Sequence, residues 1–149
     1  GDLDAAVNFW HFGAKMEAAG MRPLVTVAQA GAALGLDADT PLLGYVVRGE
    51  MLRDKPDLVA GLAAASRGAK EILATDDAAW EALRPQMNAK TDAQFAALKA
   101  GFRAGIPAPG PVDEAAAQKM LEIMARLGGE ELVGKMTSLP EGVFVQPGS

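Results

Sequence analysis

Residues 42–47 read LLGYVV, and this short stretch decides the fold class that the sequence predicts. It is an almost continuous apolar run with two adjacent valines and one tyrosine, and it carries no charge. A short run of this kind is typical of a strand that is covered on both faces, because helices in globular proteins are usually longer. We therefore predict a buried strand here and an α/β fold for the chain.

Three further segments have the side chains of strands: residues 3–10, 24–28 and 143–146. Each contains β-branched or aromatic residues, and Gly or Pro flanks most of them. Outside these segments the composition favours helices, since half of the residues are apolar but only 5% are aromatic. The expected fold is thus helix-rich with a few short strands.

The clearest helix is predicted over residues 58–73, where apolar side chains recur at helical spacing from Leu58 to Leu73. It follows the sequence Asp54-Lys55-Pro56-Asp57, in which Asp54 or Asp57 is a candidate N-cap. Shorter helices are predicted at residues 13–19 and 27–34, with one helical turn at 50–53. Three further helices are predicted to begin at Thr75, Thr91 and Asp113. Pro85 would stop the helix that begins at Thr75, and Gly128-Gly129 would end the helix that begins at Asp113. Trp80 lies with Leu83 on the helix predicted after Thr75, and we predict that it belongs to the core.

The length and the net charge of the chain limit the classes of protein to which it can belong. At 149 residues it has the size of one domain with one sizeable hydrophobic core. Fourteen basic and nineteen acidic residues give a net charge of −5, and no basic cluster is dense enough to follow a phosphate backbone, so nucleic acid is not an expected partner. No apolar run approaches the roughly 20 residues that a membrane span requires.

Catalytic and metal chemistry find little support in the sequence. His11 is the only histidine, and none of the serines that could serve it as a nucleophile, Ser66, Ser138 and Ser149, lies in a nucleophile-elbow motif. One histidine and no cysteine do not make an ordinary zinc site, and no glycine-rich nucleotide fingerprint occurs. Residues 37–40 start like a calcium loop, but Pro41 and Leu42 follow where the loop needs its glycine. We therefore predict a protein that is not an enzyme and has no catalytic residue, no metal and no cofactor.

The best candidate site is a cluster near the start of the sequence. Asn8, Phe9, Trp10 and His11 combine flat apolar side chains with hydrogen-bonding groups at the end of a predicted strand. Small-molecule sites have this character, an apolar lining with a few placed polar groups. Phe9 or Trp10 would form a wall for the ligand, Asn8 and His11 would hydrogen-bond to it, and Tyr45 in the strand predicted at residues 42–47 would contribute to the ligand-binding site.

Two stretches resemble a known family. GDLDAAVNFWHFGAKMEAAG at residues 1–20 and TPLLGYVVRGEMLRDKPDLVAGLAAASRGAKEIL at residues 40–73 are similar to the second half of the substrate-binding proteins of ABC importers, of the nitrate, sulfonate, taurine and thiamine-precursor type. Gly1, Asp4 and Ala5 match the strand of that family, and Lys55-Pro56-Asp57 matches a helix start. Residues 8–11 stand where the commoner pattern has an aromatic residue, a carboxylate and a proline, so the resemblance does not identify the ligand.

The resemblance implies the C-terminal part of a two-lobed periplasmic-binding-protein fold of type II. Residues 1–41 would form the end of the second lobe and the crossover, and residues 42–149 would form the closing, helix-rich portion of the first lobe. The implied function is that of a solute-binding component that holds a small organic or anionic ligand in the cleft and delivers it to the membrane permease subunits. Its partners would also include a missing N-terminal half, and its location would be periplasmic or membrane-tethered outside the cytoplasm, although no signal-peptide pattern opens this chain.

One alternative belongs to a different class of protein. The chain could be a small helix-rich interaction domain without a ligand cleft, in which residues 9–12 anchor a core or contact a partner surface. A weaker alternative is a hydrolase or isomerase that uses His11 as its base.

Overall fold

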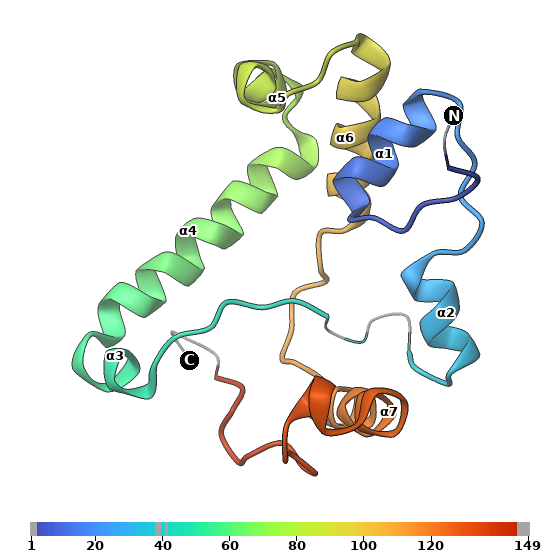
Figure 1. The fold of residues 1–149 in the computed structure, drawn as a ribbon. Coiled ribbons are helices and arrows are strands. Elements are labelled where there is room, and N and C mark those ends of the chain that lie inside the picture. The colour runs from blue at the N-terminus through green and yellow to red at the C-terminus, as the bar shows by residue number, and fades with distance from the viewer. Residues whose placement is uncertain (1–2, 38–39, 41, 146–149) are drawn as a thin grey trace. The chain divides into compact units, whose positions relative to one another are not determined.

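A computed structural model describes residues 3–37, 40 and 42–145 of the chain. This described part forms seven α-helices and one short 3-10 helix, and none of its residues belongs to a β-strand (Figure 1). The predicted α/β fold, and with it the two-lobed architecture that the resemblance implied, is therefore wrong for this structure. The described part is all-helical.

The four predicted strands have two outcomes in the structure. Residues 3–9 lead directly into a helix that begins at Trp10, and residues 24–26 lead into another that begins at Val27. Residues 42–48 and 143–145 belong to no helix or strand, and Gln146 lies outside the described residues. A strand exists only when a neighbouring strand accepts its hydrogen bonds, and the alternation of side chains carries no information on whether that neighbour is present.

The chain divides into two compact units, Gly1–Leu24 with Ala65–Pro107 and Val25–Ala64 with Ala108–Ser149. The first unit contains α1 (Trp10–Ala18), the end of α4 (Pro56–Thr75), α5 (Asp77–Leu83), η1 (Arg84–Gln86) and α6 (Asp92–Ala104). The second contains α2 (Val27–Ala33), α3 (Gly49–Asp54), the start of α4 and α7 (Glu114–Val133). The predicted division of the chain at residue 41 stays a prediction.

Trp80 and the neighbouring aromatic residues form the core of the first unit. Trp80 is only 4% exposed, and Phe95 and Leu98 on α6 are buried with it. The indole meets the ring of Phe102 edge to face at 5.4 Å, and its Nε1 donates a hydrogen bond to the carbonyl oxygen of Leu73 at 2.7 Å. The prediction that Trp80 is a core residue is thus confirmed.

An ion-pair network closes the same core at its edge. Asp77 in the first turn of α5 accepts hydrogen bonds from Arg103 at 2.8 Å and from Lys99 at 3.2 Å. Arg103 also donates through Nε to the carbonyl oxygen of Leu73 at 3.0 Å, the same oxygen that Trp80 uses. The last turn of α4 is thereby tied to both α5 and α6.

The second unit has its own set of buried apolar residues, which are Leu36, Val59, Leu121 and Ile123. Lys119 on α7 donates a hydrogen bond to the carbonyl oxygen of Gly35, just beyond α2. Gln118 on the same helix accepts one from the backbone N–H of Leu139 at 2.9 Å. These two side chains of α7 therefore fasten the segments that follow α2 and α7.

Helix ends were predicted better than strands. Thr91 and Asp113 cap α6 and α7 as expected, since their side chains accept hydrogen bonds from the N–H groups of Gln94 and Ala116. Thr75, by contrast, is the last residue of α4, and Asp76 caps α5 instead. Helix α4 begins at Pro56, which places Asp54 at the end of α3 and Asp57 in the first turn of α4.

Helix α7 continues past the two glycines that were expected to end it. The backbone leaves the helical region at Gly129, where φ is 59° and ψ is −157°, and a further helical stretch reaches Val133. Glycine tolerates this left-handed φ because it lacks a Cβ atom. The predicted end therefore marks a break within the helix.

None of the helices in the described part of the chain is both long and apolar enough to cross a membrane.

Candidate interaction site

Four of the five predicted site residues lie at the start of α1, where a strand end was expected. The carbonyl oxygen of Phe9, the N-cap residue, accepts hydrogen bonds from the N–H groups of Phe12 and Gly13, both at 3.0 Å. The side chain of Asn8 accepts a hydrogen bond from the N–H of Phe9 at 2.9 Å. Asn8 therefore helps to shape the entry into the helix.

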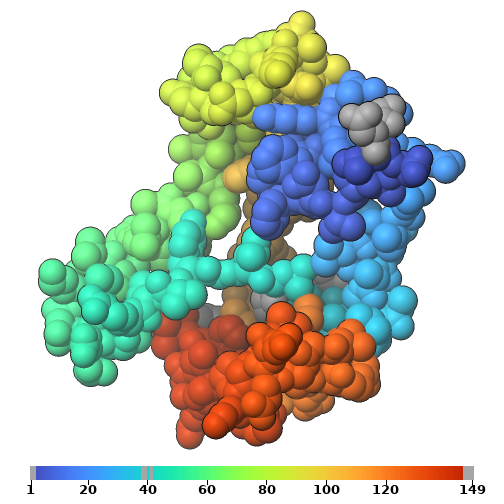
Figure 2. All heavy atoms as spheres, in the orientation of Figure 1, coloured from blue at the N-terminus to red at the C-terminus, as the bar shows by residue number. Residues whose placement is uncertain are grey.

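Residues 9–12, which we call the aromatic turn, place four rings next to one another. His11 stacks in parallel with Phe9 at a centroid distance of 6.1 Å, lies 4.3 Å from the ring of Phe12, and meets Trp10 edge to face at 5.8 Å. Phe9, Trp10 and Phe12 are 73%, 52% and 45% exposed. In Figure 2 the blue atoms of this part of the chain lie at the surface of the viewed face. The cluster is an exposed aromatic patch.

Helix α6 supports the aromatic turn from within the same unit. Helices α1 and α6 pack together, and a Cβ atom added to Gly101 would lie 3.2 Å from the indole ring of Trp10. Lys15 in the last turn of α1 donates a hydrogen bond to the carbonyl oxygen of Asn88, which precedes α6, at 3.0 Å. One side of Trp10 is thus held against the helix while about half of the residue stays accessible.

Tyr45, the fifth predicted residue, belongs to the other unit and lies in the exposed segment before α3. Its predicted part in the same site as the aromatic turn stays a prediction. The predicted ligand-binding site did not include Phe12, although its ring lies only 4.3 Å from that of His11, and residues 9–12 entered the sequence analysis together only as the anchor of the alternative interaction domain. The signal was present, because Phe12 directly follows the cluster in the sequence.

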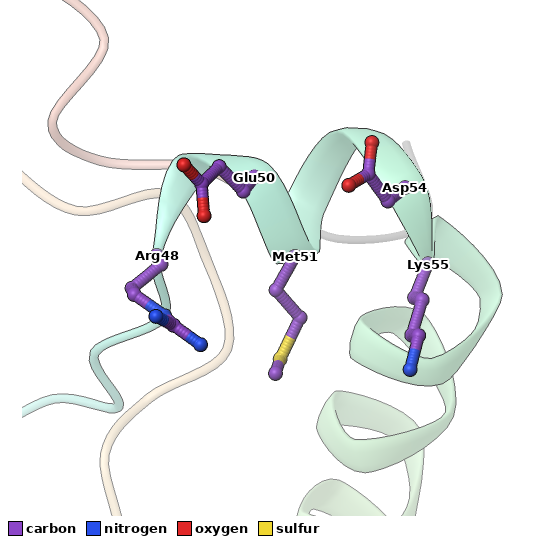
Figure 3. Close-up of a pocket in the computed structure, with 5 residues that line it drawn as sticks. All are labelled: Arg48, Glu50, Met51, Asp54 and Lys55. Carbon is purple, nitrogen blue, oxygen red and sulfur yellow. The ribbon is translucent and has the colours of Figure 1, made fainter.

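Two shallow cavities, both widely open to solvent, lie in the second unit, and none of the five predicted residues lines either of them. The first, of about 170 Å³, is lined by residues of α3 and its flanks (Figure 3). Figure 3 shows Arg48, Met51 and Lys55 projecting to one side of the helix while the carboxylates of Glu50 and Asp54 project to the other. The second, of about 430 Å³, is lined by Gly35, Leu36, Asp37, Thr40, Asp113, Ala115, Ala116 and Lys119. Both contain charges of both signs, so neither selects clearly for an anion or a cation.

The perturbed ionisable groups lie away from the aromatic turn. Hydrogen bonds from Arg103 and then Lys99 lower the pKa of Asp77 below its usual value, and a hydrogen bond to Asp92 raises the pKa of Arg84. The guanidinium of Arg84 also lies over the ring of Phe95 at 4.5 Å. Both groups act in holding α5 and α6 together. The described residues contain no group of three or more His, Cys, Asp or Glu side chains that could hold a metal ion.

In the aromatic turn, imidazole, indole and two phenyl rings are available for contact, with no charged side chain among residues 8–12. Such a surface can bind apolar or aromatic groups and offers the ring nitrogens for one or two hydrogen bonds. Comparison with known proteins adds no assignment, because no family model and no curated protein matches this chain.

Proposed function

We propose that this chain is a helix-rich interaction domain that uses the aromatic turn to bind an apolar surface on a partner protein. The observation that carries the proposal is the exposure of Phe9, Trp10 and Phe12 on a helix that packs against α6. Large aromatic residues dominate the binding energy of many protein interfaces, especially where they enter a pocket on the partner. A single exposed aromatic residue is common on a protein surface and needs no explanation. Here three exposed aromatic residues adjoin one another.

The support from α6 makes the aromatic turn suitable for binding. Association costs free energy when mobile side chains become ordered, and a residue that is already held loses less. Trp10 is held by its contact with Gly101, and the hydrogen bond of Lys15 to Asn88 fixes the other end of α1. A partner can therefore cover the open part of Trp10 with little further ordering of the domain.

The function implied by the family resemblance, a solute-binding component of an ABC importer, stays a prediction. Its support is the sequence similarity of residues 1–73, while neither described cavity is lined by the residues expected to hold the solute. The interaction domain has the more direct support, since it needs an accessible surface rather than an enclosed site.

A photo-crosslinking residue at position 12, in the cells that make this protein, tests the proposal. We expect one discrete protein adduct, which the second substitution Trp10→Ala strongly reduces. The matched control places the same residue at Leu83, which is exposed to a similar extent in the same unit. Once the adduct identifies the partner, Trp10→Ala in the purified proteins should raise Kd by about 30-fold, as expected for an interface hot spot.

Two results would contradict the proposal. The first is an absence of adducts, or the same set of adducts from position 12 and from Leu83. The second is a saturable change in the emission of Trp10, the tryptophan that remains in the Trp80→Phe variant, on addition of a small organic anion. That second result would favour the solute-binding function instead.

A further inference from the structure

Helix α4 carries a row of apolar residues at the protein surface. Figure 1 shows α4 as one continuous helix, which spans Pro56–Thr75. Leu58, Leu62 and Ile72 are 59%, 50% and 54% exposed, and Ala65 and Ala69 between them are exposed as well. We call these five residues the α4 seam. The apolar spacing that predicted this helix therefore includes a complete row of side chains that the chain does not bury.

A neighbouring row of α4 is the one that the chain covers. Val59 is buried, and Ala63, Ser66, Lys70 and Leu73, which follow it at the same spacing, are half-buried. Successive residues of an α-helix are turned by about 100°, so this row lies about 100° around the helix from the seam. One side of α4 therefore packs within the chain, while about half or more of each large side chain of the seam stays accessible.

The spacing of the seam indicates the shape of the surface that would cover it. Its residues follow one another at intervals of four, three, four and three. This alternation keeps apolar side chains in line along two helices that wind around each other, where each side chain enters a hole between four residues of the facing helix. A second α-helix is therefore the surface that fits the seam.

Two glycines beside the seam point to a close approach of that second helix. Gly61 and Gly68 are seven residues apart, so they lie on the same side of the seam. Glycine within a helix is less stable than alanine, yet a Cβ atom on either residue would meet no other part of the described chain within 4 Å. The packing of the single chain does not require these glycines, whereas a second helix could come closest where the Cβ atoms are missing.

We propose that the α4 seam packs antiparallel against the seam of a second copy of this chain, and that the two copies form a reversible homodimer. The seam extends over about four helical turns, which makes an interface of the small and weak class. It contains no residue of the aromatic turn, so it does not rest on the function proposed above.

The sizes of the seam residues favour one antiparallel register. When the two-fold axis crosses the pair between residues 63 and 64, Leu62 of each copy lies opposite Ala65 of the other, and Leu58 lies opposite Ala69. Each layer then combines a large and a small side chain, which allows the layers to interdigitate. A parallel pair in register would instead place Ala65 against Ala65 and Ala69 against Ala69, and leave the middle of the interface poorly filled.

The same register suits the positions that flank the seam. Gly61 of one copy lies on the same side of the pair as Gly68 of the other, with an offset of two residues or about 3 Å along the helices. The flanking positions are residues 59, 66 and 73 on one side and 61, 68 and 75 on the other, and none of them is charged. Two identical surfaces can therefore meet without contact between like charges, and the antiparallel helix dipoles attract each other.

The oligomeric state of the full chain tests the proposal. Sedimentation equilibrium should show a monomer and a dimer whose ratio depends on concentration. Leu62→Lys should weaken the dimer by about tenfold or more, because it removes an apolar contact from two layers and adds a charge to each. Leu127→Lys is the matched control, since Leu127 is an exposed leucine on α7. Circular dichroism should show unchanged helix content in both variants.

Gly61→Ala separates helix pairing from helix stability. In the monomer it should raise the midpoint of urea denaturation, because alanine favours a helix and the new Cβ atom has room. In the dimer it should weaken association by about tenfold, because the added Cβ atoms hold the two helices apart. Gly13→Ala on α1 is the control, since a Cβ atom there also meets nothing within 4 Å and should leave the dimer unchanged.

The register can be tested because the chain has no cysteine of its own. Facing positions of two closely packed helices lie within reach of a disulfide, which joins Cα atoms about 4.4 to 6.8 Å apart. A mixture of Leu58→Cys and Ala69→Cys chains should therefore oxidise mainly to the mixed dimer. Residue 58 of one copy and residue 58 of the other are offset by eleven residues, about 16 Å along the helices, which is too far.

Four results would overturn the proposal. One is a chain that stays monomeric at every concentration, which would leave the seam to a different partner. Another is an equal loss of the dimer in Leu127→Lys, which would place the contact elsewhere. The third is an undiminished dimer in Gly61→Ala. The last is a preference for disulfides between identical positions, which would show a parallel pair.

Discussion

The α5–α6 region and residues 42–47 both carry large apolar side chains, but the structure buries the first set and exposes the second. Trp80, Phe95 and Leu98 are all buried, whereas Leu43 and Val46 are almost fully accessible. Trp80 on α5 meets Phe102 on α6 edge to face within one unit, and ion pairs of Asp77 with Lys99 and Arg103 join the same two helices. Among the described residues no second strand pairs with residues 42–47. The difference teaches that burial requires a complementary surface as well as an apolar sequence.

The backbone polar groups of the two regions also differ in whether they have hydrogen-bond partners. The carbonyl oxygen of Leu73, at the end of α4, accepts hydrogen bonds from both Trp80 and Arg103. The peptide groups around Leu43 and Val46 have no comparable backbone partner in the described part of the chain. The carbonyl oxygen of Leu73 therefore finds its partners within the chain, while the peptide groups of Leu43 and Val46 are left to solvent.

The largest expected effect separates these two regions directly. Trp80→Ala should lower the free energy of unfolding by about 3 to 5 kcal/mol, because it empties a buried site and removes the hydrogen bond to Leu73. Leu43→Ala should change it by less than about 0.5 kcal/mol, since the side chain is exposed. Urea denaturation at a protein concentration where the chain is monomeric measures both. Comparable losses in the two variants would show that residues 42–47 are packed in the monomer.

A smaller effect is expected at the N-cap of α6. Thr91→Ala should destabilise the protein by about 1 kcal/mol in the same assay, because the N–H of Gln94 loses its side-chain acceptor. Thr75→Ala serves as the control, since Asp76 and not Thr75 caps α5. If Thr75→Ala were the more costly of the two, the helix boundary at residues 75–77 would be wrong.

Two glycines test how tightly the aromatic turn is held against α6. Gly68→Ala should stabilise the protein by about 0.5 to 1 kcal/mol, because a Cβ atom there meets nothing within 4 Å and alanine favours a helix. Gly101→Ala should gain less, since its Cβ atom would press on Trp10. In the Trp80→Phe background, Gly101→Ala should also shift the emission of Trp10 to longer wavelength as the ring becomes more exposed. Equal gains and unchanged emission would contradict the contact between α1 and α6.

The smallest effect concerns the ion pairs of Asp77. The pKa of Asp77 is lower in the folded state than its value of about 3.8 in the unfolded chain. The ionised carboxylate therefore stabilises the folded protein at pH values above about 3.8. This contribution is lost as the pH falls through the lower pKa of the folded state. Asp77→Asn should therefore reduce the acid-dependent part of the unfolding free energy. The change should be slight and should shrink further at high salt, because Asp77 is exposed and solvent screens the pairs. An unaltered pH profile would show that the ion pairs do not form in solution.

Helix boundaries could be predicted from the sequence because their causes are local. Thr91 with Gln94 and Asp113 with Ala116 are capping pairs only three residues apart, and both appear in the structure as expected. The apolar spacing after Leu58 gave most of α4, and Pro85 marked the end of α5. The error at Thr75 is equally local, because Thr75, Asp76 and Asp77 are adjacent candidates and only the geometry of the turn chooses among them.

The candidate site was predicted only in part. The sequence drew attention to residues 8–11 by their rarity, and the structure shows that their rings lie together. The sequence did not predict that Tyr45 belongs to another unit. It also did not predict that Asp77, Lys99 and Arg103, which span 26 residues, form one network. These relations depend on how distant segments meet, and neither composition nor spacing reports that.

By itself the sequence determined where α6 and α7 begin and that Trp80 belongs to a core, since caps and apolar spacing act within a few residues. Only the tertiary structure decided that residues 42–47 stay outside any strand, that the aromatic turn begins a helix, and that Trp10 is half exposed while Trp80 is buried. The physical reason is that strand formation and burial both require a second surface, and that surface comes from residues far away in the chain or from another molecule.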